Sequence, residues 1–237
     1  MDLDLAGKYF GEVVTDEVKY AADGTTVEGY TAPDLSNVDY VVVGMRPPFN
    51  GGIAQGYDPE EGKYIPVSLQ YKPYVADGEN VRKESIAGNL LPDGTQENRT
   101  YFGETANVTN VADLEALERA HAAVEASGKD IPIITIVKGQ SGYAAFALAG
   151  TIPAEFEPLS DALLMSYSVT QEAMLNVALG IHDSAGRLPI GLAPDMDAIE
   201  KQFEDVPMDQ GAYVDSEGNA YEFGFGLGCD NAVLSAN

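Results

Sequence analysis

The sequence predicts an α/β fold, a three-layer αβα sandwich around a mostly parallel sheet, with a long irregular loop excursion and a short β tail. Apolar, β-branched runs at residues 38–44, 131–137 and 161–166 are typical of strands that are buried on both faces. Amphipathic segments at 110–128 and 170–180 alternate with these runs. The order strand, helix, strand, strand, helix is typical of a parallel sheet with helices on both faces.

The first half of the chain contains one buried strand between two irregular regions. Residues 1–37 mix short apolar pieces with Gly, Asp and Thr, so strands and turns are expected there. The buried strand 38–44 follows. Residues 45–107 are rich in Pro-Pro, Gly-Gly and Asp-Gly pairs, with one candidate strand at 65–71. A loop of this length is usually functional or covers a partner.

The second half has clearer element boundaries. Asn110 is a favourable N-cap for a helix that Gly128 stops, and Thr170 caps a second helix that ends at Gly180. After Gly186 the pattern breaks into short pieces, with a small helix at about 196–203 and a hairpin at 215–219. The first helix carries an apolar stripe of Val111, Leu114, Leu117, Ala120 (or His121) and Val124.

Composition excludes several classes of partner. The chain has 237 residues with 38 Asp plus Glu against 13 Lys plus Arg, a net charge of −25. Such a surface repels phosphate backbones and anionic headgroups, so neither nucleic acid nor a membrane is expected as a partner. No apolar run approaches the roughly 18 residues of a membrane span, and the acidic first residues do not resemble a signal peptide. We therefore expect a soluble, cytoplasmic protein.

Metal, cofactor and nucleophile signals are weak. Cys229 is the single cysteine, and neither His121 nor His182 has a second ligand at metal-binding spacing, so no metal and no cofactor is expected. Residues 138–142 (Lys-Gly-Gln-Ser-Gly) follow a strand but lack the spacing of a phosphate loop. They also fail the nucleophile-elbow pattern, because Tyr occupies position 143.

Carboxylates near the end of the first strand are candidates for catalysis. Asp58, Glu60 and Glu61 lie in the loop that follows strand 38–44. Ligands of open parallel sheets bind beyond the carboxyl ends of the strands, which is where this loop begins. Glycoside hydrolysis needs two carboxyl groups. The alternative is that this acidic segment is a solvated turn.

Five short segments follow one another in a recognisable order and spacing over about residues 38–228. They are 66–74 (Pro-Val-Ser-Leu-Gln-Tyr, then Pro-Tyr), 156–162 (Phe-Glu-Pro-Leu-Ser-Asp-Ala), 184–189 (Ser-Ala-Gly-Arg-Leu-Pro), 203–207 (Phe-Glu-Asp-Val-Pro) and 223–227 (Phe-Gly-Phe-Gly-Leu). Together they resemble the C-terminal α/β sandwich domain of family 3 glycoside hydrolases of the β-glucosidase type. We therefore expect one domain over 1–237 with its core at about 38–228.

The resemblance implies an enzyme that hydrolyses O-glycosidic bonds, of the β-glucosidase or β-xylosidase type. In this family an N-terminal barrel carries the nucleophile, an aspartate in a Ser-Asp-Trp context. The present sequence has no Trp and no room for such a barrel. The chain is therefore expected to be inactive alone and to need a family 3 barrel in cis or in trans. Whether it counts as an enzyme stays uncertain.

The resemblance also assigns positions that contact substrate. In some members an acid/base glutamate follows the strand ending in Val-Gly, and this position corresponds to Asn50 here. Asparagine cannot exchange a proton at useful pH, so the usual acid/base is lost. Arg46 and Asn50 can still hydrogen-bond sugar hydroxyls. Asp58, Glu60 or Glu61 could substitute as the acid/base, although no motif supports this.

Two other functions stay open. The domain could be a non-catalytic carbohydrate-binding or interaction module on the same fold, or an unrelated flavodoxin-like nucleotide binder, which the absent phosphate loop disfavours. A sandwich without its barrel would expose an apolar surface, so we also expect self-association or marginal stability.

Overall fold

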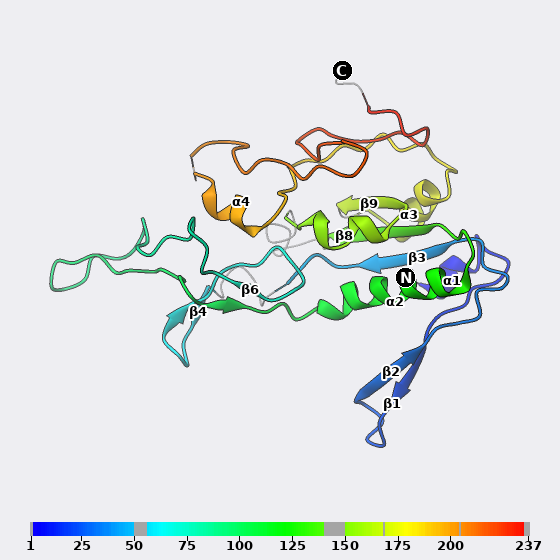
Figure 1. Ribbon diagram of the computed structural model, residues 1–237, viewed down its shortest axis with the longest axis horizontal. Helices are drawn as coiled ribbons and strands as arrows, with labels where there is room; N and C mark the ends of the chain where they lie inside the picture. Colours follow the sequence, from blue (N-terminus) through cyan, green and yellow to red (C-terminus); the bar gives the residue numbers. More distant parts are fainter. Residues whose placement is uncertain (1, 50–55, 140–149, 168, 204, 235–237) are drawn as a thin grey trace.

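The computed structural model describes residues 2–49, 56–139, 150–167, 169–203 and 205–234, and Figure 1 shows how its elements are arranged. A three-stranded parallel sheet lies at the centre, in the order β3-β8-β9. The three predicted strands are confirmed, each shifted by one to a few residues, although the last of them is mostly half-buried. Their bounds are Val41–Met45 (β3), Ile133–Gly139 (β8) and Ala162–Tyr167 (β9).

Two helices cover this sheet, α2 (Val111–Ser127) and α3 (Gln171–Ala178). Alternate side chains of the strands point to opposite faces, because the side-chain period of a strand is two residues. On one face Val43 and Val137 belong to a buried cluster with Leu117 of α2. On the other face Ile136 packs with Met174 of α3. The predicted αβα layering is thereby confirmed.

The core is larger on the α2 side of the sheet. Tyr71 and Phe156 join it from outside the sheet, with their rings edge to face at 6.2 Å between centroids. Burying apolar side chains of this size stabilises the fold by about 1.5–3 kcal/mol each. The buried members of this cluster are Val43, Met45, Tyr71, Leu114, Leu117, Ile133, Val137 and Phe156.

Both helices have the predicted end residues, but only one of the two predicted N-caps makes a side-chain capping bond. Gly128 follows α2 with φ 65°, and Gly180 follows α3 with the same φ, a conformation that favours glycine. Thr170 caps α3, since its Oγ1 accepts a hydrogen bond of 3.2 Å from Ala173 N. Asn110 precedes α2 but makes no side-chain capping bond. Its amide is engaged by the segment that follows β3.

The N-terminal region contains a helix that the sequence did not indicate. It is α1 (Leu3–Ala6), followed by a hairpin of β1 (Glu17–Tyr20) and β2 (Val27–Thr31) that projects from the body in Figure 1. Strands with turns were the expectation for this region, and the hairpin agrees with it. Arg119 of α2 links the hairpin to the body, because its guanidinium lies 3.7 Å from the ring centroid of Tyr30.

The excursion after β3 forms two small antiparallel sheets. They pair β4 (Tyr57–Asp58) with β5 (Lys63–Tyr64), and β6 (Tyr74–Val75) with β7 (Thr105–Ala106). The strand predicted at 65–71 is absent. Pro66 has no N–H to donate to a ladder, and Tyr71 N donates to the carboxylate of Glu155 instead of to a strand, at 2.5 Å.

The region after β8 adds short elements around the sheet. Two 3-10 turns, η2 (Pro153–Glu155) and η3 (Glu157–Leu159), precede β9, and α4 (Met196–Lys201) lies near the predicted small helix. In the described part of the C-terminal tail, the expected β structure consists of isolated bridges, Val214 with Ala220 and Leu227 with Val233.

Two of the recognisable segments pack on each other. Leu188 N donates to Phe225 O, and Gly224 N donates to Leu188 O, each at 2.8 Å. A Cβ added at Gly226 would overlap the carbonyl oxygen of Gly186. Gly226 therefore allows the backbones of the 184–189 and 223–227 segments to approach closely. Among the described residues, no helix is long and apolar enough to cross a bilayer.

Candidate functional site

The segment directly after β3 is clamped to the first turn of α2. Arg46 donates from Nε and Nη2 to Asp113, at 2.9 and 2.8 Å, and its backbone N donates to the same carboxylate at 2.8 Å. Such paired, charge-assisted bonds are strong and directional. Burial acts to raise the pKa of Asp113, but the hydrogen bonds from Arg46 outweigh it and lower that pKa. The hydrogen bond with Asp113 also raises the pKa of Arg46.

Asn110 holds the same segment from a second direction. Its Oδ1 accepts from Phe49 N at 2.9 Å, and its Nδ2 donates to Arg46 O at 3.1 Å and to Pro47 O at 2.9 Å. The Tyr71 hydroxyl also donates to Arg46 O, at 2.5 Å. Asn110 is 4% exposed, its bond to Pro47 O is buried, and its bonds to Phe49 N and Arg46 O are partly buried. Residues 46–49 are therefore fixed at the carboxyl end of β3.

The turn at Tyr71 is held by a partly buried carboxylate. Glu155 accepts from Tyr71 N at 2.5 Å and from Lys72 N at 3.0 Å. Desolvation raises the pKa of Glu155, although the two backbone N–H groups and Lys72 oppose the shift. Burial likewise raises the pKa of the Tyr71 hydroxyl, which favours its neutral form. These contacts position the turn and leave Glu155 facing backbone amides.

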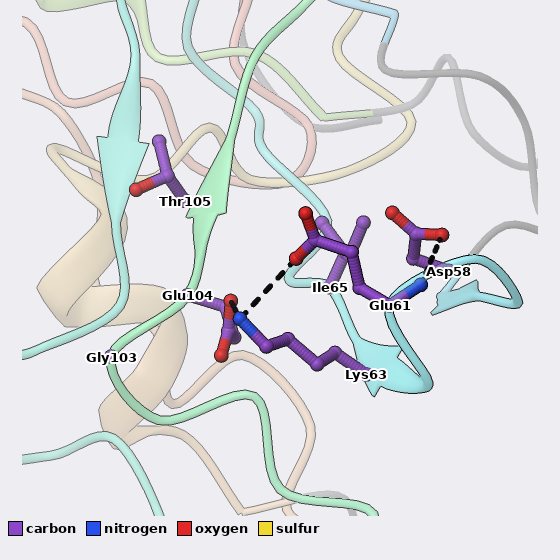
Figure 2. Close-up of a pocket in the computed structure, with 7 residues that line it drawn as sticks. All are labelled: Asp58, Glu61, Lys63, Ile65, Gly103, Glu104 and Thr105. Atoms are coloured by element: carbon purple, nitrogen blue, oxygen red, sulfur yellow. Dashed lines mark hydrogen bonds and ion pairs between the residues drawn. The ribbon is translucent and has the colours of Figure 1, made fainter.

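A polar pocket of about 290 Å³ lies within the excursion, between the β4–β5 hairpin and the start of β7. Figure 2 shows that the Lys63 ammonium lies between two carboxylates, Glu61 at 3.3 Å and Glu104 at 3.4 Å. The hydrogen bond with Glu61 and the charge of Glu104 raise the pKa of Lys63, so the ammonium stays protonated. The lining residues are Asp58, Glu61, Lys63, Ile65, Gly103, Glu104 and Thr105.

The structure gathers the three candidate carboxylates around one turn. Asp58 Oδ1 accepts from Glu60 N at 2.8 Å and from Glu61 N at 3.2 Å, which closes the β4–β5 hairpin. Asp58 and Glu61 line the pocket, whereas Glu60 is exposed and is not among its lining residues. The Glu61 side chain is 63% exposed. The surroundings of Glu61 are thus polar and solvated.

The two predicted substrate contacts have different outcomes. Arg46 is exposed but does not line the pocket, and its Nε and Nη2 edge is taken by Asp113. Asn50 lies outside the described residues. The same is true of residues 140–142 in the segment that follows β8. The structure therefore tests neither a sugar contact at Asn50 nor one at the remaining edge of the Arg46 guanidinium.

Sequence reasoning missed Lys63 and Glu104 of the pocket, and Asp113 of the clamp. A lysine two positions after the acidic pair Glu60-Glu61 is a detectable signal for Lys63, because neighbouring opposite charges tend to pair. Glu104 is 41 residues from Lys63 along the chain, so no local pattern indicates that they pair. Asp113 is 67 residues from Arg46 along the chain, so no local pattern indicates this pair either.

The comparisons with known proteins find partial relatives. The chain is 38% identical over 68 residues to beta-glucosidase C of Emericella nidulans, which covers 29% of this chain and 10% of that protein. It is 34% identical over 76 residues to probable beta-glucosidase C of Aspergillus flavus and of Aspergillus oryzae, which covers 32% of this chain and 11% of each relative.

The matched segments cover only a small part of this chain and of each relative. No family model matches the chain. The chain spans about a tenth of the length of the curated relatives it matches. The comparisons therefore identify a glycoside-hydrolase-related segment in about 30% of the chain, on an α/β fold.

Proposed function

We propose that this chain is an α/β sandwich domain of the family 3 glycoside hydrolase type, which contacts carbohydrate beside an active site whose nucleophile comes from a separate barrel. The substrate class is a β-glucoside or β-xyloside. Alone, the chain has negligible turnover. The domain extends over residues 1–237, with its core at about 38–228.

One observation carries this proposal. The partial relatives are all beta-glucosidases by name, and their similarity accompanies a parallel sheet with helices on both faces. The fixed segment 46–49 supports it further, because rigid loops at the carboxyl ends of parallel strands are where such sheets hold ligands. Fold alone does not imply an activity, so the proposal depends on the named relatives.

The excursion carboxylates are suited to binding rather than to proton transfer. A general acid needs surroundings that keep its carboxyl group protonated, such as an apolar pocket. Glu61 instead is exposed and ion-paired with Lys63, and Asp58 is committed to the hairpin turn. We therefore assign Asp58 and Glu61, which line the pocket, to contacts with sugar hydroxyls. Arg46 and Asn50 remain proposed substrate contacts, and Glu60, which is not among the lining residues, is given no role.

A second function has its own support. The pocket presents an ammonium donor beside several carboxylate acceptors, which suits a non-catalytic carbohydrate-binding module on the same fold. A saturable sugar-binding isotherm without hydrolysis, with or without a barrel, would favour this second function.

The first test is hydrolysis of nitrophenyl β-glucoside and nitrophenyl β-xyloside by the purified chain, with and without a separately expressed family 3 barrel. We expect no turnover from the chain alone and turnover when the barrel is added, beyond that of the barrel by itself. Activity of the chain alone would contradict the assignment of an absent nucleophile. No gain with the barrel would refute the complementing domain.

Matched variants sharpen this test. Glu61→Gln removes one pocket carboxylate, and Glu222→Gln removes an exposed carboxylate that is not among the pocket-lining residues. We expect only the first to raise the KM of the complemented enzyme.

A sandwich without its barrel also exposes apolar surface, so we propose that the chain self-associates. A monomer by light scattering at tens of micromolar, with a cooperative melt, would count against self-association.

A further inference from the structure

The pocket in the excursion has walls that are held in place by local contacts. Gly62 N donates to Asp58 O at 2.8 Å and Ile65 N donates to Gly56 O at 3.0 Å, which together close the hairpin wall. Tyr64 extends this support, since its hydroxyl donates to Glu97 at 2.6 Å. The backbone of the hairpin wall is therefore held by local hydrogen bonds.

The opposite wall is equally constrained. Gly103 N donates to Ala76 O at 2.7 Å, and Glu104 N donates to Tyr101 O at 3.0 Å. Gly103 has φ 85°, a conformation that glycine adopts without strain. Lys63 then joins the two walls through its ion pairs with Glu61 and Glu104.

The charges of the lining restrict the ligand. Asp58, Glu61 and Glu104 outnumber Lys63 by three charges to one, so an anion is repelled. A metal ion is also disfavoured, because the Lys63 ammonium lies between two of the carboxylates. A metal ion there would meet a positive charge where it needs oxygen ligands. Among the described residues, no group of three or more carboxylate, His or Cys side chains could hold a metal ion.

A neutral polyhydroxylated ring matches this lining. Each hydroxyl both donates and accepts, so it can donate to a carboxylate and accept from the ammonium or from the Thr105 hydroxyl. The volume of about 290 Å³ is at the lower end of the ~300–1,000 Å³ that small-molecule sites occupy. It therefore admits one sugar ring rather than an oligosaccharide, with Ile65 offering the apolar contact.

We propose that this pocket is a binding subsite for a single neutral sugar unit, with Lys63 as the central donor and Glu61 and Glu104 as the flanking acceptors. The inference rests on the proposed function, since it supposes that the chain handles carbohydrate. It goes further by naming the site and by excluding uronic acids. An open, solvated site of this kind is expected to bind with a Kd on the order of 1 mM.

The test is an NMR titration of the full chain with methyl β-glucoside, methyl β-xyloside and methyl β-glucuronoside. Lys63→Met and Glu104→Gln each remove one side of the central contact. Lys72→Met is the matched control, since Lys72 is similarly exposed and pairs with Glu118 at 4.0 Å, outside the pocket. Circular dichroism melts establish that each variant is folded.

We expect the two neutral glycosides to bind with similar affinity and the glucuronoside about tenfold more weakly or worse, a difference of about 1.4 kcal/mol. Lys63→Met and Glu104→Gln should each weaken glucoside binding about tenfold, while Lys72→Met leaves it unchanged. Shifted resonances should come from residues 56–65 and 103–105.

Three results would overturn the subsite. They are the absence of saturable binding at about one hundred times the expected Kd, a glucuronoside that binds as tightly as the glucoside, and an effect of Lys72→Met equal to that of Lys63→Met. Failure here with intact barrel complementation rejects only the subsite. Binding here without complementation rejects only the glycosidase role.

Discussion

Replacing Asn110 by Ala tests whether the segment after β3 is held as the structure indicates. The amide of Asn110 makes three hydrogen bonds, to Phe49 N, Arg46 O and Pro47 O. Arg46 O keeps the hydroxyl of Tyr71 as a second donor, so Phe49 N and Pro47 O lose the most. At about 1–3 kcal/mol for each of these two groups left without a partner, we expect a loss of about 2–6 kcal/mol in the free energy of unfolding.

The assay is urea unfolding at pH 7, with Asn107→Ala as the control, because Asn107 is exposed three positions earlier. The control should stay within about 0.5 kcal/mol of the wild type. Asn110→Asp keeps the shape but turns a carboxylate oxygen toward two carbonyls, so it should also destabilise at pH 7. If the free energy of unfolding of Asn110→Ala lies within about 0.5 kcal/mol of the wild-type value, the Asn110 side chain does not hold segment 46–49.

The remaining predictions concern charge, close packing and the contacts of α4. Asp113→Asn should cost about 1.5–3 kcal/mol at pH 6 by weakening the pairing with Arg46. The pKa of Asp113 is lowered in the folded state, so its carboxylate stabilises the fold at pH values above the unfolded pKa of about 3.9. This contribution is lost as the pH falls through the pKa of the folded state. A stability difference between Asp113→Asn and the wild type that is as large at pH 2 as at pH 6 would contradict this. Gly226→Ala should lower the thermal midpoint by several degrees through backbone overlap, whereas Gly29→Ala, with open space around it, should not. Glu200→Ala removes the acceptor of two tyrosine hydroxyls, each at 2.8 Å, and should make α4 an early site of limited proteolysis; unchanged cleavage would mean that these bonds do not hold α4.

The three strands of the central sheet and the two helices that cover it could be predicted from the sequence. The apolar stripe containing Leu114 and Leu117, followed by Gly128, indicated α2, because a helix repeats every 3.6 residues and glycine tolerates the positive φ at its end. The β-branched runs indicated β3 and β8 for an equally local reason. Asp58 and Glu61 could also be placed in one acidic turn, since they are neighbours along the chain.

Only the tertiary structure decided which partners the polar side chains take. Asn110 is a good N-cap by residue type, yet its amide bonds to backbone groups more than 60 residues earlier. The strand expected at 65–71 did not form, because its backbone found acceptors and donors near Glu155 and Ile152. Lys63 and Glu104, which are 41 residues apart in the chain, lie in contact only because the excursion folds back on itself. Local propensity selects helices and strands, but a hydrogen bond or ion pair forms with whichever group packing brings within about 3 Å.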